Sequence, residues 1–210
     1  CKKNIQMSYY REDKQEPESI YQLNNTETYQ IPNVMFYSFN EKKWYVGNSV
    51  STIRFQTEGI MVEDVLGRMD SDTVTMVGEE SYSPDELLLI LLKTHIQEFM
   101  GRSEEYELCG LTITLEQYHK RVYDVLRKLQ EELSLSAEQF YIMSHENAFF
   151  QYVMNQDEKL RNNSVAMFEY GTDGPYIYYL RKSGKKKEAF ENAYKEIRGK
   201  WKKKAFGSLN

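Results

Sequence analysis

A glycine-bounded turn is the segment of this chain whose residue types and spacing most clearly could do chemistry. The turn is Gly171-Thr172-Asp173-Gly174, and it joins two strand-like runs, Val165–Tyr170 and Pro175–Leu180. Glycines at both ends of a four-residue turn allow backbone angles that other residues avoid, so the segment predicts a β-hairpin. Backbone N–H groups in such a turn can also bind phosphate, which makes these four residues the candidate cofactor-binding residues.

Glu146 and Glu169 are the candidate catalytic residues. A Mg²⁺ ion that is bound together with phosphate needs only one or two carboxylates from the protein, and either glutamate could hold it or orient a water. The alternative is structural. Glu146 then stabilises a helix N-terminus, Glu169 is an ordinary strand residue, and the two glycines only make the turn.

The histidines and cysteines do not predict a metal site. His95, His119 and His145 match no spacing of paired metal ligands. His95 and His119 are expected on helices, at the surface or at its boundary. Cys109 is expected on a buried strand, where it would pack as an apolar residue.

The composition predicts a globular protein without a membrane span. Of the 210 residues, 40% are hydrophobic and 14% are aromatic, and the longest apolar run, Leu87–Leu92, is far shorter than a membrane-spanning helix. The two cysteines form no CxxC pattern and favour a reducing compartment, so we expect a cytoplasmic protein. Cys1 leaves two interpretations open, namely the lipidated first residue of a mature lipoprotein or a strand that was cut upstream.

The net charge of −5 is unevenly distributed. Residues 181–204 hold eleven Lys or Arg and three Glu, whereas the rest of the chain holds 16 basic and 29 acidic residues. Because the basic residues alternate with an apolar stripe, we expect residues 182–210 to form a helix that packs on the same domain. Binding of nucleic acid is the less favoured alternative.

Short runs of apolar and aromatic residues predict an antiparallel meander in the first part of the chain. The expected strands are Ile5–Tyr10, Ser19–Leu23, Val34–Phe39 and Trp44–Val46, with a further short strand around Ile53–Phe55.

Two helices begin with capping-box patterns. Ser83 and Glu86 predict a helix that ends at about Met100, and Thr114 and Gln117 predict a helix over Leu115–Leu133. The other expected elements are the strands Cys109–Thr114 and Gln139–Met143, the helix Glu146–Met154 and the hairpin. Alternating strands and helices of this kind predict a layered α/β domain with a mixed sheet flanked by helices.

This order of elements resembles the first lobe of the actin-like ATPase superfamily, and in particular the DnaK-type heat-shock chaperones. Ser144-His145-Glu146-Asn147-Ala148 resembles the family's Asn-Glu-Pro-Thr-like segment, and Phe168–Gly174 resembles its second phosphate hairpin. Ile31-Pro32-Asn33-Val34 with Tyr45-Val46-Gly47 is similar to the early Pro-Ser-Val strand and its partner. The resemblance covers residues 1–181 and implies a ribonuclease H-like fold that binds ATP or ADP with Mg²⁺.

Departures from the family pattern argue against ATP turnover. Glu169 stands where the family has Asp, and Asp173 brings a negative charge to the place of a phosphate. We therefore expect a degenerate nucleotide-binding lobe that senses nucleotide or binds a protein partner inside the cell. The alternatives are a scaffold for protein contacts that binds no nucleotide, and a trimmed piece of a complete ATPase.

Overall fold

The structure, a computed structural model, describes residues 4–20, 29–104, 106–116, 119–157, 164–171 and 174–180. The chain forms two compact units. Unit 1 consists of Cys1–Leu111 and Tyr118–Tyr141, and unit 2 consists of Thr112–Gln117 and Ile142–Asn210. The predicted helix over 182–210 and its boundary with a lobe over 1–181 lie outside the described residues, so both stay predictions.

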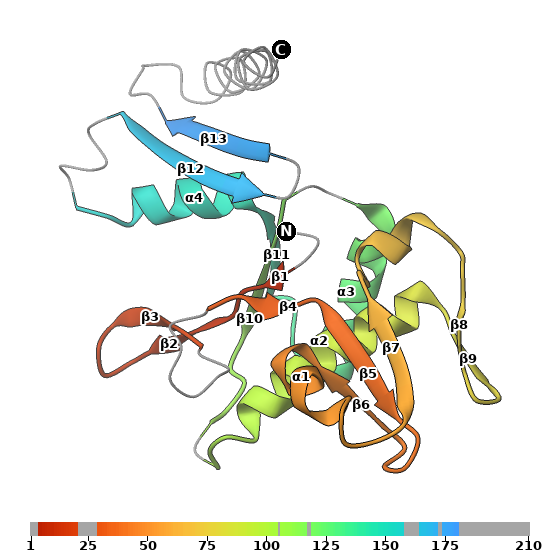
Figure 1. The fold of residues 1–210 in the computed structure, drawn as a ribbon. Helices are drawn as coiled ribbons and strands as arrows, with labels where there is room; N and C mark the ends of the chain where they lie inside the picture. The colour runs from red at the N-terminus through yellow and green to blue at the C-terminus, as the bar shows by residue number, and fades with distance from the viewer. Residues whose placement is uncertain are drawn as a thin grey trace, which may run out of the picture. The chain divides into compact units, whose positions relative to one another are not determined.

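Short antiparallel strands are the main elements of the first part of unit 1 (Figure 1). Strand β1 pairs with β4, β2 with β3 and β8 with β9, while β6, β5 and β7 form a three-stranded sheet in that order. The strands are β1 (Asn4–Ile5), β2 (Ser8–Arg11), β3 (Glu16–Ser19), β4 (Ile31–Pro32), β5 (Val34–Ser38), β6 (Lys43–Val46), β7 (Gly59–Glu63), β8 (Thr75–Val77) and β9 (Glu80–Tyr82).

The predicted meander is confirmed at β5 and β6, but the strand expected around Ile53–Phe55 is wrong. The 3-10 helix η1 (Gly47–Ser49) and helix α1 (Val50–Ile53) follow β6, and the third strand of the sheet is β7. Gly47 has a φ of 58°, a backbone angle that favours glycine and turns the chain out of β6 into helical turns. Extended structure returns at Gly59, where a Cβ would clash with the Tyr37 carbonyl oxygen.

Helix α2 (Pro84–Met100) begins and ends as the sequence predicts. The Ser83 backbone N–H donates to Glu86 Oε2 at 2.7 Å, and the Glu86 N–H donates back to Ser83 Oγ at 3.3 Å, which completes the capping box. The Ser83 hydrogen bonds hold the pKa of the Glu86 carboxyl below its usual range. Pro84 occupies the first turn, where no intrahelical N–H bond is lost.

The core of unit 1 lies around α2, which contacts both β6 and helix α3 (Lys120–Glu132). Fully buried side chains come from α2, from α3 and from the three-stranded sheet, where Val46 and Val62 both pair with Met35. They include Met35, Val46, Val62, Leu87, Leu91, Leu126 and Leu129. Burial of each of these side chains removes enough apolar surface from water to stabilise the fold by about 1.5–3 kcal/mol.

His95 is part of this core, so the prediction that it lies at the surface or its boundary is wrong. Its side chain is 2% exposed, and neither ring nitrogen has a hydrogen-bond partner within the described residues. Position 95 follows Leu87, Leu88 and Leu91 on the buried face of α2, and helical periodicity therefore carries the imidazole inward. Burial without a compensating partner lowers the pKa of His95 to about 4.

Helix α3 begins at Lys120 and not at Leu115, and the capping box of Thr114 and Gln117 is wrong because Thr114 lies within strand β10 (Leu111–Leu115). The cap is His119, whose Nδ1 accepts a hydrogen bond from the Val122 N–H at 3.4 Å.

Cys109 is exposed and precedes β10, so its predicted place on a buried strand is also wrong. The paired part of this segment begins only at Leu111, two residues further on.

Arg121, in the first turn of α3, connects three parts of unit 1. Its Nε donates to Asp85 Oδ1 at 2.7 Å, and its Nη1 donates to Asp72 Oδ1 at 2.9 Å and to the Ser71 carbonyl at 2.8 Å. These bonds tie the start of α2 to the segment after the 3-10 helix η2 (Gly67–Asp70). The hydrogen bonds to the two carboxylates raise the pKa of Arg121, which therefore stays charged.

Unit 2 contains most of β10 and of strand β11 (Phe140–Ser144), which pair with each other. The order strand, helix α3, strand is the β-α-β arrangement of parallel pairs, so the molecule is a mixed α/β fold with antiparallel and parallel strands and flanking helices. Helix α4 (His145–Met154) and the paired strands β12 (Val165–Gly171) and β13 (Gly174–Leu180) complete unit 2. Among the described helices, none combines the length and the apolar character needed to cross a membrane.

The buried imidazole predicts an acid sensitivity that a variant can remove. The unfolded chain binds a proton at the ordinary histidine pKa of 6.5 and the folded chain only at about 4, so stability falls as the pH decreases from 6.5 to 4. The loss reaches about 3 kcal/mol. Urea denaturation at pH 7 and pH 4.5 should show it in the wild type and not in His95→Leu. His145→Gln is the control, and an unchanged pH dependence in His95→Leu would contradict the assignment.

Candidate functional site

The predicted hairpin is confirmed in unit 2. Strands β12 and β13 are antiparallel, and their register runs from Val165 opposite Leu180 to Gly171 opposite Gly174. The two glycines are therefore the last residue pair before the turn. Thr172 and Asp173, the other two candidate cofactor-binding residues, lie outside the described residues.

The two candidate carboxylates come from different elements of unit 2. Glu169 occupies the register position opposite Tyr176, two residues before Gly171. Glu146 lies in the first turn of α4, where an acidic residue is favoured by the helix dipole. Both positions are consistent with the structural alternative as well as with a role at a ligand.

Ser144 fixes the start of α4. Its Oγ accepts a hydrogen bond from the Asn147 backbone N–H at 3.1 Å, so it is the N-cap of a ten-residue helix. The first N–H groups of a helix have no intrahelical partners and lie at the positive end of its dipole. This helix start can therefore attract an anionic group.

The hairpin packs on α4 through a small apolar cluster. Phe149 and Val153 of α4 are buried with Tyr178 of β13, and the rings of Phe149 and Tyr178 have centroids 6.4 Å apart. Val165 and Met167 of β12 pack against the same cluster.

This packing sets the relative direction of the helix and the hairpin within unit 2. Figure 1 shows the N-terminal end of α4 at the same end as the arrowhead of β12, which is the Gly171 end of the strand. Glu146 precedes Phe149 by three residues, so it shares the packed side of the helix with that ring. The structure thus brings Glu146 and the Gly171–Gly174 pair to one end of unit 2.

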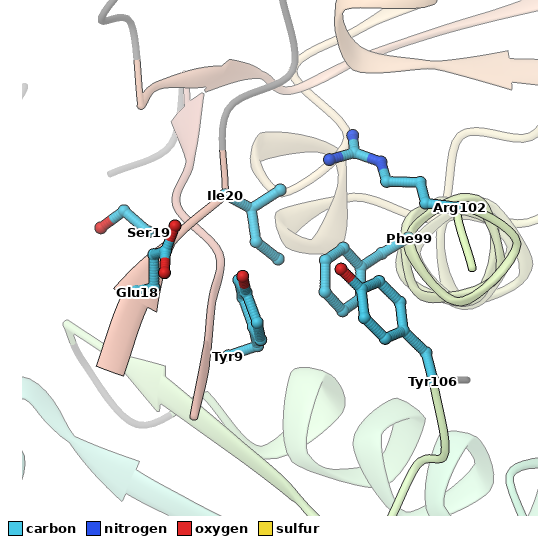
Figure 2. Close-up of a pocket in the computed structure, with 7 residues that line it drawn as sticks. All are labelled: Tyr9, Glu18, Ser19, Ile20, Phe99, Arg102 and Tyr106. Atoms are coloured by element: carbon cyan, nitrogen blue, oxygen red, sulfur yellow. The ribbon is translucent and has the colours of Figure 1, made fainter. Parts of the chain in front are cut away.

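Unit 1 contains a separate cavity that the sequence did not predict. Its volume is about 130 Å³, and it is lined by three aromatic rings, one aliphatic side chain and three polar residues (Figure 2). The lining residues are Tyr9, Glu18, Ser19, Ile20, Phe99, Arg102 and Tyr106.

The three rings contact one another. Phe99 and Tyr106 are stacked, with centroids 5.0 Å apart and an interplanar angle of 16°. Tyr9 is inclined to both, at 5.3 Å from Phe99 and 6.1 Å from Tyr106. The Arg102 guanidinium lies 5.7 Å from the centroid of the Phe99 ring, a cation–π contact.

Glu18 at the edge of the cavity is held by basic residues. Arg11 Nη1 lies 3.1 Å and Lys14 Nζ lies 3.4 Å from Glu18 Oε2. The hydrogen bond from Arg11 holds the pKa of the Glu18 carboxyl below its usual range, so Glu18 is ionised at neutral pH.

Within the described ranges, no group of three or more His, Cys, Asp or Glu side chains is placed to hold a metal ion. The role of Glu146 and Glu169 as ligands of Mg²⁺ therefore stays a prediction. In that role they would supply one or two ligands, and phosphate oxygens would supply others.

The sequence is matched over residues 16–204 by a family model described as "Family of unknown function (DUF5716) C-terminal". No curated protein matches the sequence of this chain.

The cap of α4 leads to a prediction about unit 2. Replacing Ser144 with alanine removes the side-chain acceptor of the Asn147 N–H, which destabilises the helix start by about 1 kcal/mol. Hydrogen exchange should become faster at Asn147–Phe149 in Ser144→Ala, while Ser136→Ala, a change of an exposed serine, should leave these rates unaltered. Equal exchange in the two variants would show that Ser144 does not fix the start of α4.

Proposed function

We propose that this chain, which belongs to the DUF5716 C-terminal family, is a degenerate actin- and chaperone-like nucleotide-binding lobe. In this proposal it senses ATP or ADP with Mg²⁺, or presents a nucleotide-dependent surface to a protein partner, in the cytoplasm. The finer fold assignment, a ribonuclease H-like actin-type lobe, is part of the same proposal.

One observation carries the nucleotide part of the proposal. The start of α4, with its cap Ser144 and with Glu146, lies at the same end of unit 2 as the Gly171–Gly174 pair of the hairpin (Figure 1). Backbone N–H groups of a helix start and of a glycine turn are two common ways to bind phosphate. A carboxylate in the first turn of the helix, that of Glu146, suits a hard cation that accompanies the phosphate.

The order of elements supports the resemblance to the first lobe of the actin-like ATPases and chaperones. Strand β10, helix α3, strand β11, helix α4 and the β12–β13 hairpin follow one another as in the first lobe of the chaperones. The proposal does not include ATP turnover, because Asp173 places a negative charge within the turn.

A second candidate function is a scaffold for protein contacts that binds no nucleotide. The aromatic cavity of unit 1 favours it, since tyrosines, phenylalanines and arginines are enriched where proteins contact one another.

Thermal unfolding with ATP, ADP and Mg²⁺ tests the nucleotide proposal. A ligand at 100 times its Kd stabilises the folded state by about 2.7 kcal/mol, which raises the Tm measurably. Gly171→Val should abolish this shift, because side chains at the turn keep a phosphate away from the backbone. Glu146→Gln should reduce only the part of the shift that depends on Mg²⁺, since the amide is close in size but uncharged.

The controls separate loss of the site from loss of the fold. Circular dichroism checks that Gly171→Val is folded, and Glu138→Gln, the same chemical change at an exposed position of unit 1, should shift as the wild type does. A wild type whose Tm does not respond to either nucleotide would refute the nucleotide proposal and leave the scaffold. A shift that survives both Gly171→Val and Glu146→Gln would place the nucleotide elsewhere.

A further inference from the structure

Helix α4 has an apolar outer face that stays exposed within the described part of unit 2. One side of the helix is buried against the hairpin, whereas Phe150 on the other side is 40% exposed and Met154 is 45% exposed. These two residues are four positions apart and are therefore neighbours on one face. Glu146 is the only Asp, Glu, Lys or Arg of the helix. An outer helix face normally carries charged residues, so this face is suited to contact with another apolar surface.

The chain leaves the hairpin at the end of unit 2 where α4 also ends. Strand β13 finishes at Leu180, opposite Val165, and Figure 1 shows its arrowhead on the side of unit 2 at which α4 ends. The residues that follow Leu180 therefore start near the C-terminal end of α4. The five residues Arg181–Lys185 can span up to about 17 Å when they are extended, which is enough to lead the chain onto the outer face of the helix.

The segment that comes next matches this face in pattern and length. Residues 186–204 lie outside the described residues, and their sequence predicts an amphipathic helix. Its apolar residues recur at steps of four, three and four, and they are Phe190, Tyr194, Ile197 and Trp201. At about 1.5 Å per residue, this stripe is about 16 Å long and the ten-residue helix α4 is about 15 Å long.

The charges of unit 2 and of this segment are opposite. Residues 112–117 and 142–180 hold six Asp or Glu and two Lys or Arg, whereas residues 181–204 hold eleven Lys or Arg and three Glu. Acidic residues lie at both ends of α4, with Glu146 in its first turn and Asp157 three residues after its last. The basic residues beside the apolar stripe can therefore be attracted to them. The family model also reaches residue 204, so the basic segment belongs to the matched domain.

From these observations we infer that residues 186–204 form a helix that packs antiparallel on the outer face of α4. The apolar stripe covers Phe150 and Met154, and the basic residues lie beside the acidic residues at the two ends of α4. Because the tether is short, it keeps the segment at a local concentration in about the millimolar range, so a small apolar contact suffices. Detachment of the segment would uncover an apolar helix face and a basic surface together. The inference does not depend on the nucleotide proposal.

Tryptic digestion followed by mass spectrometry tests the inference, because trypsin cleaves after the basic residues of the segment. The measured quantity is the initial rate of cleavage after Lys195, Arg198 and Lys200, which lie within the stripe. A synthetic peptide of residues 181–204 gives the rate of the undocked segment. The full chain should be cleaved about tenfold more slowly than the peptide, since cleavage follows the population of the detached state.

Phe150→Asp combined with Met154→Asp should raise this rate to within about twofold of that of the peptide, because a carboxylate on the outer face opposes burial. Tyr152→Asp is the matched control. Tyr152 is 60% exposed and lies two positions from both of the other residues, on a different side of the helix. This control should be cleaved as the wild type is. Circular dichroism checks that each variant is folded, and Ile197→Asp tests the contact from the other side.

Three results would overturn the inference. Cleavage of the wild-type segment as fast as that of the peptide would mean that the segment does not pack. Protection that persists both in the Phe150→Asp, Met154→Asp double variant and in Ile197→Asp would place the segment on another surface. Protection that appears only after single-stranded RNA or phosphatidylserine vesicles are added would assign the basic segment to a nucleic acid or to a membrane and not to α4.

Discussion

Burial of α2 is the constraint on which unit 1 depends. Its leucines lie against β6 and α3, and the helix cannot turn or slide without exposing them. Everything attached to the two ends of the helix is positioned by this packing. At the N-terminal end Asp85 receives Arg121, which ties α3 and the segment after η2 to α2. At the C-terminal end Phe99 and Arg102 form one side of the aromatic cavity. The cavity is thus carried by a buried helix and not by loops alone, which favours a fixed geometry.

Unit 2 depends in the same way on a smaller set of contacts. Phe149 and Val153 bury one side of α4 against the hairpin, and Ser144 fixes where the helix begins. Because a two-stranded hairpin is only marginally stable alone, this packing also supports β12 and β13. The direction of α4 then brings Glu146 to the end of the unit at which the glycine pair lies. A ligand at that end would contact both elements, so binding would change how firmly the helix and the hairpin are held together.

Local sequence signals predicted much of the fold, and distant contacts explain what they missed. The capping box of Ser83 and Glu86 and the glycine pair of the hairpin depend on residues a few positions apart, so both were found correctly. The start of α3 was placed too early because Thr114 offers the same local pattern, while pairing with β11 holds it in a strand. No local pattern could have revealed the cavity, because Tyr9, Phe99 and Tyr106 meet only after β2 and α2 have folded together.

Hydrogen exchange with and without ADP and Mg²⁺ tests most directly whether unit 2 is a nucleotide site. The account predicts slower exchange at the amides of His145–Phe149 and at the Gly171 and Gly174 ends of β12 and β13, with unit 1 unaltered. Such a pattern would follow if phosphate bound the N–H groups of the helix start and of the turn together. Exchange in unit 2 that does not respond to a saturating concentration of nucleotide, or protection confined to unit 1, would contradict the account.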